Sequence, residues 1–172
     1  MTAVSRLRQG VRALCAWLRP VDDDLAARVL PPNLLPLFQQ MRRAERQHSL
    51  SVLRTLQRRG CTHPAAWQAA LLHDYGKSRY PFPLWQRVLV VIVGGIWRER
   101  ARRWGRSAPH GWRRPFVIRQ QHPQWSADAV EALGGDPLVV RLIANHAEKL
   151  TGAPRDDFER LLQALQEADN AN

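Results

Sequence analysis

A histidine and an aspartate stand side by side at His73-Asp74, directly after the alanine- and leucine-rich residues 65–72. The small apolar side chains predict a closely packed helix, and Gly76 is expected to end it. The pair would then lie in the last turn of a buried helix and face inward. An imidazole nitrogen beside a carboxylate oxygen suits a divalent metal, whereas a buried carboxylate without a cationic neighbour is costly. Lys77 is one candidate neighbour, and a metal ion is the better one.

Other candidate ligands fall on the inward faces of helices expected elsewhere in the chain. On a helix over residues 44–58, His48 shares the apolar face. On a later helix that starts at Pro137, His146 also shares the apolar face. Asp169 continues the apolar stripe of the last helix, which a bound metal would explain. The alternative for Asp169 is a frayed C-terminus.

With His122, the chain offers four inward histidines and two carboxylates, more than one metal ion usually takes from a protein. The set matches a pair of ions that share a bridging carboxylate, for which Asp74 is the natural choice. Lys77 is one of 2 lysines beside 24 arginines. Its presence after the His-Asp pair suggests a need for a compact point charge, for instance on a substrate phosphate.

The segment Leu72-His73-Asp74-Tyr75-Gly76-Lys77 resembles the signature of the HD superfamily of metal-dependent phosphohydrolases. Members of that family are all-helical and order their ligands as His, then His-Asp, then a distant Asp. Two-metal members add two histidines in between. By this resemblance the common metal set is His48, His73, Asp74 and Asp169, and the second ion is held by His122 and His146.

The resemblance implies an all-α, single-domain helical bundle of the HD-domain type, with N-terminal helices over 1–43 packed on an HD domain over 44–172. The implied activity is a phosphohydrolase or phosphodiesterase that acts on a phosphate ester, expected to be a nucleotide, through a hydroxide that bridges two metals. Two divalent transition-metal ions such as Fe or Mn are expected, with Mg²⁺ as the alternative. Asp74 and Lys77 are the expected catalytic residues. The Gly-Tyr-Pro element of the cyclic-di-GMP phosphodiesterase branch is missing from the sequence, which argues against that substrate.

Two other classes of function remain open from the sequence. Some members of the family use a similar ligand set in a di-iron oxygenase. Alternatively, the chain could be an inactive module that kept the fold and binds a membrane or nucleic acid, although the complete ligand set argues against this. Other acidic and histidine residues are poorer candidates for a site because they fall in expected loops, caps or first helical turns, or, for Asp128, among polar neighbours: His63, His110, Asp128, Asp136, Asp156 and Asp157.

Composition sets bounds on these readings. A chain of 172 residues with 45% apolar content can form one domain with a proper core. The net charge of +11 favours phosphate-bearing substrates, nucleic acid or an anionic membrane surface, and of these nucleic acid is not expected as a partner. We expect a cytoplasmic protein, because the cysteines show no disulfide or metal spacing and no secretory signal or roughly 20-residue apolar run is present.

Two segments raise the question of a peripheral membrane contact. Residues 5–18 predict an amphipathic helix that lies on the core, with a membrane-surface anchor as the alternative. Within residues 84–106, an apolar front half is expected to be buried and an arginine-rich back half to be solvated. The alternative is an apolar wedge and basic run on an anionic membrane. After His122, Pro123 is expected to open a new helix.

Overall fold

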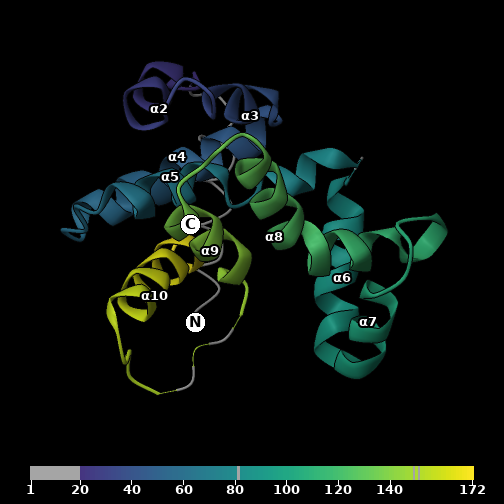
Figure 1. The fold of residues 1–172 in the computed structure, drawn as a ribbon. Coiled ribbons are helices and arrows are strands. Elements are labelled where there is room, and N and C mark those ends of the chain that lie inside the picture. The colour runs from purple at the N-terminus through teal and green to yellow at the C-terminus, as the bar shows by residue number, and fades with distance from the viewer. Residues whose placement is uncertain (1–19, 81, 149, 151) are drawn as a thin grey trace, which may run out of the picture.

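The computed structural model describes residues 20–80, 82–148, 150 and 152–172. This part of the chain consists of α-helices, two short 3₁₀ helices and their connections, and it contains no strand. Figure 1 shows the helices gathered into one bundle, with α6 (Leu84–Ile96) and α7 (Arg98–Gly105) standing at one side. The all-α, single-domain bundle is therefore confirmed. The amphipathic helix expected over 5–18 lies outside the described residues, and the division into 1–43 and 44–172 stays a prediction.

The bundle core is built around α5 (Pro64–Leu72). Its alanines and leucines are buried on nearly all sides, so other helices can approach its backbone closely. Against it pack α4 (Arg43–Arg58), α9 (Pro137–Asn145) and α10 (Asp157–Asn170). Two short helices, α2 (Asp23–Val29) and α3 (Leu35–Gln40), also contact α5. The core thus holds the helices that carry most of the candidate ligands.

Helix starts follow ordinary capping chemistry in this chain. The side chain of Asp136 accepts a hydrogen bond from the Leu138 amide at 2.7 Å, and Asp156 accepts one from the Glu159 amide at 2.7 Å. His63 caps α5 in the same way, through Nδ1 and the Ala65 amide. These contacts explain the three residues without a metal. The sequence predicted a cap at Asp136, whereas His63 was expected in a loop and Asp156 in a first helical turn.

Gly76 has a different role from the predicted one. Helix α5 ends at Leu72, and Gly76 lies beyond that end, inside a 3₁₀ helix η1 (Tyr75–Arg79). Its amide donates to Ser126 Oγ at 2.8 Å, and a Cβ added here would lie 2.4 Å from the carbonyl oxygen of His122. The glycine is therefore needed for close approach of two backbones, not for ending a helix.

Pro123 does not open a helix, contrary to the prediction. It lies inside α8 (Arg114–Ala132), which starts with Pro115 near its N-terminus. A proline within a helix removes one backbone N–H and leaves the carbonyl four residues earlier, that of Arg119, without its usual donor. His122 Nδ1 lies 2.9 Å from this carbonyl and can donate to it. The side chain thus replaces the missing backbone bond.

The prediction for the apolar front half of residues 84–106 is also wrong. Helix α6 buries only Gln86 and Val90 among its described side chains, while most of its apolar residues are exposed. The helix stops at Trp97, whose φ of −123° and ψ of 59° separate it from α7. Helix α6 contacts α8 through the face that carries Gln86 and Val90, and no other described part of the chain covers the rest of α6. Among the described helices, none has the length and apolar character needed to cross a membrane.

Candidate metal centre

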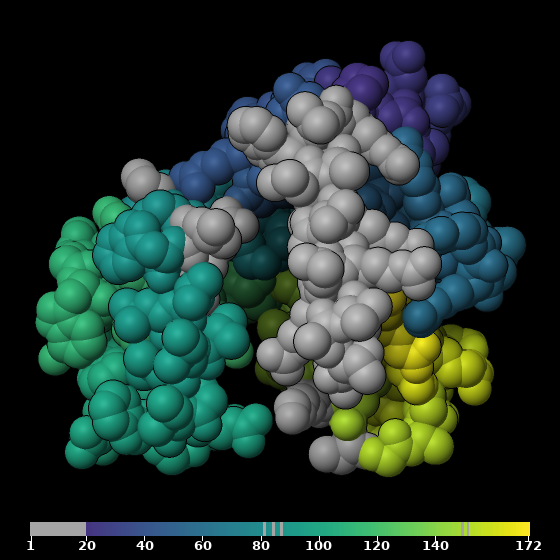
Figure 2. Space-filling model, turned by 180° about the vertical axis from the view of Figure 1, so that it is seen from behind, coloured from purple at the N-terminus to yellow at the C-terminus, as the bar shows by residue number. Residues whose placement is uncertain are grey.

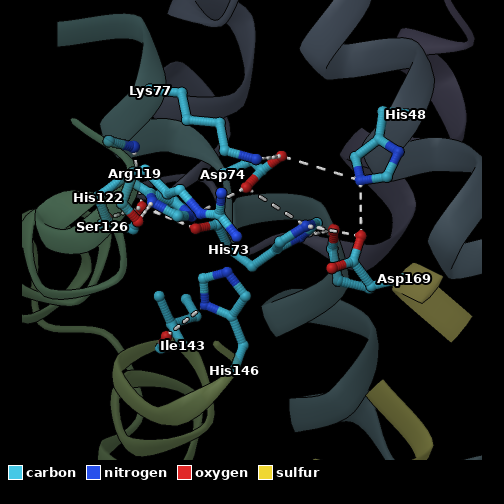
Figure 3. A network of polar contacts seen from close by, with 12 residues as sticks. His48, His73, Asp74, Lys77, Arg119, His122, Ser126, Ile143, His146 and Asp169 are labelled. Carbon is cyan, nitrogen blue, oxygen red and sulfur yellow. Dashed lines mark hydrogen bonds and ion pairs between the residues drawn. The ribbon is translucent and has the colours of Figure 1, made fainter. Parts of the chain in front are cut away.

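The six candidate ligands converge on one place inside the bundle, although they come from helices far apart in the sequence (Figure 3). His48 projects from α4, and His73 and Asp74 follow the end of α5. His146 follows the end of α9, while the remaining two residues come from the middle of α8 and the end of α10, namely His122 and Asp169. The site therefore depends on the packing of five helices.

Short distances join the imidazole and carboxylate atoms. His48 Nε2 lies 2.8 Å from Asp169 Oδ1, and His73 Nε2 lies 3.7 Å from the same oxygen. Asp74 Oδ1 lies 3.6 Å from His73 Nε2 and 3.4 Å from His122 Nε2. The ring of His146 completes the cluster, with its centroid 4.9 Å from that of His73 and 5.2 Å from that of His122.

Two buried atoms at the centre of the cluster have no hydrogen-bond partner among the described residues: His73 Nε2 and Asp74 Oδ1. An unpaired buried polar atom costs free energy, and two that face each other are better explained by a shared ligand. Two donors bound to one ion at about 2.1 Å and at a tetrahedral angle lie about 3.4 Å apart. The gap of 3.6 Å between these atoms is close to that value. The donor set thus fits a metal ion.

The ligand atoms form two overlapping groups within the described residues. One group contains His48, His73 and Asp169, and the other contains His73, Asp74 and His146. Within each group the donor atoms lie within 4.8 Å of one another. His122 Nε2 stands beside the second group through its approach to Asp74. An imidazole nitrogen binds one ion, so two neighbouring ions would need a carboxylate between them. Asp74 is placed for this, because its Oδ2 atom also lies 3.8 Å from His48 Nε2.

Three of the histidines are oriented by the same device. The Nδ1 atom of His73 lies 3.0 Å from the Ala70 carbonyl oxygen, and that of His146 lies 2.7 Å from the Ile143 carbonyl oxygen. Both carbonyls belong to the last turn of a helix, where backbone acceptors are free. In the middle of α8, His122 Nδ1 makes the equivalent contact with the Arg119 carbonyl, which lacks a backbone donor because of Pro123. With Nδ1–H donated to backbone, each ring presents the lone pair of Nε2 to the cluster.

A comparison with protein-family models identifies the family of the chain. The model described as HD domain matches residues 46–171, which is most of the chain. The chain belongs to the HD-domain family. HD domains form a superfamily of metal-dependent hydrolases, and they bind divalent metals. Searches of curated proteins and of solved structures found no match to the chain.

The electrostatics of the HD-domain cluster keep the histidines of α8 and α9 neutral. Burial lowers the pKa of His146 to about 3, and burial likewise lowers the pKa of His122. Burial also opposes protonation of His73, but the carboxylates of Asp74 and Asp169 outweigh it and raise the pKa of His73. A neutral imidazole is the form that binds metal, so two of the rings are ready to act as ligands.

The two carboxylates are ionised. Burial alone would raise their pKa values, but His73 and Lys77 lower the pKa of Asp74 well below its ordinary range. Contacts with His48 and His73 lower the pKa of Asp169 below its ordinary value in the same way. Both side chains therefore carry the negative charge that a cation needs.

Lys77 contacts the other oxygen of Asp74. Its Nζ atom lies 2.7 Å from Asp74 Oδ2, on the side away from the unpaired Oδ1. From the sequence we expected a metal rather than Lys77 as the neighbour of this carboxylate. In the structure Lys77 is the neighbour of one of its two oxygens, Oδ2. The lysine side chain is 26% exposed, so it is partly open to solvent beside a carboxylate that is buried.

Ser126 is a supporting residue that the sequence did not reveal. Its Oγ atom lies 2.8 Å from the carbonyl oxygens of both His73 and His122, and it accepts from the Gly76 amide. It therefore joins the two segments that carry three of the candidate ligands. The available signal was a buried serine one helical turn after His122. The poorer candidates from the sequence lie in other contacts, such as Asp128 with Gln124.

Proposed function

We propose that this HD-domain protein hydrolyses phosphate esters with two bound divalent metal ions, and that its substrate is a nucleotide or a similar phosphorylated small molecule. The observation that carries the proposal is the pair of overlapping ligand groups around the unpaired His73 Nε2 and Asp74 Oδ1. Membership of a metal-dependent hydrolase superfamily supports it. The net charge of +11 favours an anionic substrate.

Each residue has a distinct part in this proposal. His48, His73 and Asp169 would hold one ion. His122 and His146, whose ring centroids lie 5.2 Å apart, would hold the other. When bound, such ions supply a nucleophilic water at neutral pH and polarise phosphoryl oxygens. Asp74 lies between the two sets, with Oδ1 3.4 Å from His122 Nε2 and Oδ2 3.8 Å from His48 Nε2, and would fix the ions relative to each other. Lys77, which is partly exposed beside Asp74, would place its positive charge on a substrate phosphate.

The donor set favours transition metals over magnesium. Four imidazoles suit a borderline ion such as Fe²⁺, and the two carboxylates also suit Mn²⁺, whereas Mg²⁺ prefers an all-oxygen shell with retained waters. We therefore expect reconstitution with iron or manganese to give the active protein. Magnesium is the alternative, and it should support less activity.

The function is tested by hydrolysis after metal replacement. The full chain is stripped with a chelator, loaded separately with Fe²⁺, Mn²⁺ or Mg²⁺, and assayed on p-nitrophenyl phosphate, on bis-p-nitrophenyl phosphate and on a panel of nucleotides. We expect metal-dependent release of nitrophenol or phosphate, highest with iron or manganese. If the iron-loaded protein consumes oxygen and hydrolyses no phosphate ester with any metal, the fold serves an oxygenase instead and the proposal is wrong.

Replacing Lys77 separates a role toward substrate from a role in the ligand shell. If its ammonium contacts phosphate, Lys77→Met should lower kcat/KM by about tenfold to a hundredfold, because a charged hydrogen bond is lost. Metal content measured by elemental analysis should not change. Lys77→Arg is the matched variant, since it keeps the charge but alters its shape. Loss of metal in both variants would assign Lys77 to the ligand shell, and unchanged kinetics in both would remove it from the mechanism.

A further inference from the structure

A broad apolar surface is exposed on α6. Among the described residues, seven of the nine exposed large hydrophobic side chains lie between residues 85 and 97. Trp85, Val91 and Ile96 are each more than three-fifths exposed, at 64%, 65% and 68%. Soluble proteins rarely expose a contiguous apolar patch without a use for it. The other members of the α6 surface are Val88, Leu89, Ile92 and Trp97.

The α6 surface is held in place rather than loosely attached. Gln86 and Val90 face inward, and the Arg119 guanidinium of α8 donates to the Val90 carbonyl oxygen at 3.0 Å. The same residue, Arg119, offers its own carbonyl to His122 in the metal centre. The exposed face of α6 is therefore a fixed part of the folded chain.

Positive charge follows the α6 surface directly. Between residues 98 and 114 the sequence contains seven arginines and one acidic residue, Glu99. The arginines of α7 are exposed, and Arg100 lies over the ring of Trp97 with its guanidinium carbon 5.9 Å from the ring centroid. A second exposed tryptophan, Trp112, packs edge-on against Trp104 of α7 with ring centroids 4.9 Å apart. Figure 2 shows the part of the chain that contains α6 and α7, in teal, on one side of the molecule, so these apolar, aromatic and cationic side chains belong to the same side.

We propose that α6 and α7 dock the protein on an anionic lipid bilayer. Helix α6 has 13 residues and would be about 20 Å long, too short to cross a hydrocarbon core of about 30 Å. It would lie in the plane of the interface, with its aliphatic side chains in the acyl boundary and Trp85 and Trp97 at headgroup depth. The arginines of α7 would contact the anionic headgroups.

The composition of the surface favours lipid over other occupants. A second copy of this chain would bring its own arginine cluster against the first, and like charges oppose that contact. Nucleic acid would use the arginines but would leave the aliphatic face of α6 in water. A bilayer with negative headgroups satisfies both parts of the surface at once. This inference concerns where the protein works, and it does not depend on the proposed hydrolysis.

Sedimentation with lipid vesicles tests the proposal. The full chain is mixed with vesicles of phosphatidylcholine alone or of phosphatidylcholine with phosphatidylglycerol. We expect it to pellet with the anionic vesicles and much less with the neutral ones, and added salt should weaken the binding. Tryptophan emission should shift to shorter wavelength in the anionic sample. A chain that stays in solution with both vesicle types would overturn the proposal.

Two sets of variants locate the contact. Replacing Arg98, Arg100 and Arg103 with Gln should weaken binding to anionic vesicles by about tenfold or more. The control set Arg28→Gln, Arg43→Gln and Arg58→Gln removes the same charge from exposed sites elsewhere and should weaken binding far less. Ile92→Asp should weaken binding through the apolar face. Equal losses in both arginine sets would show a general charge effect and overturn the assignment to α7.

Light scattering with size-exclusion chromatography separates lipid docking from self-association. We expect a mass that does not change between wild type and Ile92→Asp. A dimer in the wild type that Ile92→Asp converts to a monomer would assign the α6 surface to a second copy and overturn the proposal. Metal content serves as the check on folding, because none of these substitutions touches the metal centre.

Discussion

Asp74→Asn should abolish hydrolysis and weaken metal binding by at least about a hundredfold, more than the loss of a supporting group costs at such sites. The substitution keeps the shape of the side chain and removes its charge. Asp74 is buried, its Oδ1 atom faces His73 and His122 without a hydrogen-bond partner, and its Oδ2 atom pairs with Lys77. An amide group cannot serve both sides, because it has one oxygen: if that oxygen faces the metal, the NH2 group faces the Lys77 ammonium, and the negative charge is lost in either orientation. A hydrolysis assay measures the loss of turnover, and titration calorimetry measures the loss of metal affinity.

Asp128→Asn is the matched control for this experiment. Asp128 lies on the exposed side of α8, where it accepts from Gln124, and so it makes no contact with the cluster. The substitution Asp128→Asn should therefore leave turnover and metal affinity unchanged. Near-normal turnover in Asp74→Asn would show that the site has been assigned to the wrong residues. Circular dichroism of both variants establishes that the helices remain folded.

Gly76→Ala should destabilise the protein by about 1–3 kcal/mol, since an added Cβ overpacks a close contact. The new carbon would lie 2.4 Å from the carbonyl oxygen and 3.0 Å from the Cα of His122. These are backbone atoms of α8, so they cannot move without shifting the helix. The shift would separate η1, which carries Lys77, from the segment that carries His122. Urea denaturation of the metal-free protein measures the change in the free energy of unfolding.

Gly95→Ala makes the same chemical change as Gly76→Ala, but we expect it to stabilise the protein. Gly95 lies in α6, and a Cβ added there meets no atom within 4 Å. Because alanine loses less backbone entropy than glycine in a helix, this variant should gain about 0.5–1 kcal/mol of stability. Equal stability of the two variants would mean that η1 does not approach α8 as closely as described.

Helical periodicity was enough to place several candidate ligands on inward faces, including His48, His146 and Asp169. It could not say which helices would be neighbours, because periodicity describes one helix at a time. The family resemblance supplied that step through the order of the residues along the chain. The structure brings all six residues together, while their binding of metal stays a prediction.

The errors came from rules that treat the sequence locally. Glycine commonly follows a helix, but Gly76 is required by a contact with a segment about fifty residues away, at Ser126 and His122. Proline commonly starts a helix, but the carbonyl that Pro123 frees has a donor in His122. An apolar run usually predicts burial, but nothing in the described chain covers α6. Each outcome depended on a partner that local sequence does not specify.

The number of metal ions per chain tests the central claim most directly. The full chain is stripped of metal, reconstituted anaerobically with Fe²⁺ or with Mn²⁺, desalted and analysed for metal against protein concentration from amino-acid analysis. Two overlapping ligand groups predict close to two ions per chain, falling to about one in His146→Ala because a donor of the second group is lost. A wild-type value at or below one ion, with metal in excess during reconstitution, would contradict the two-metal site.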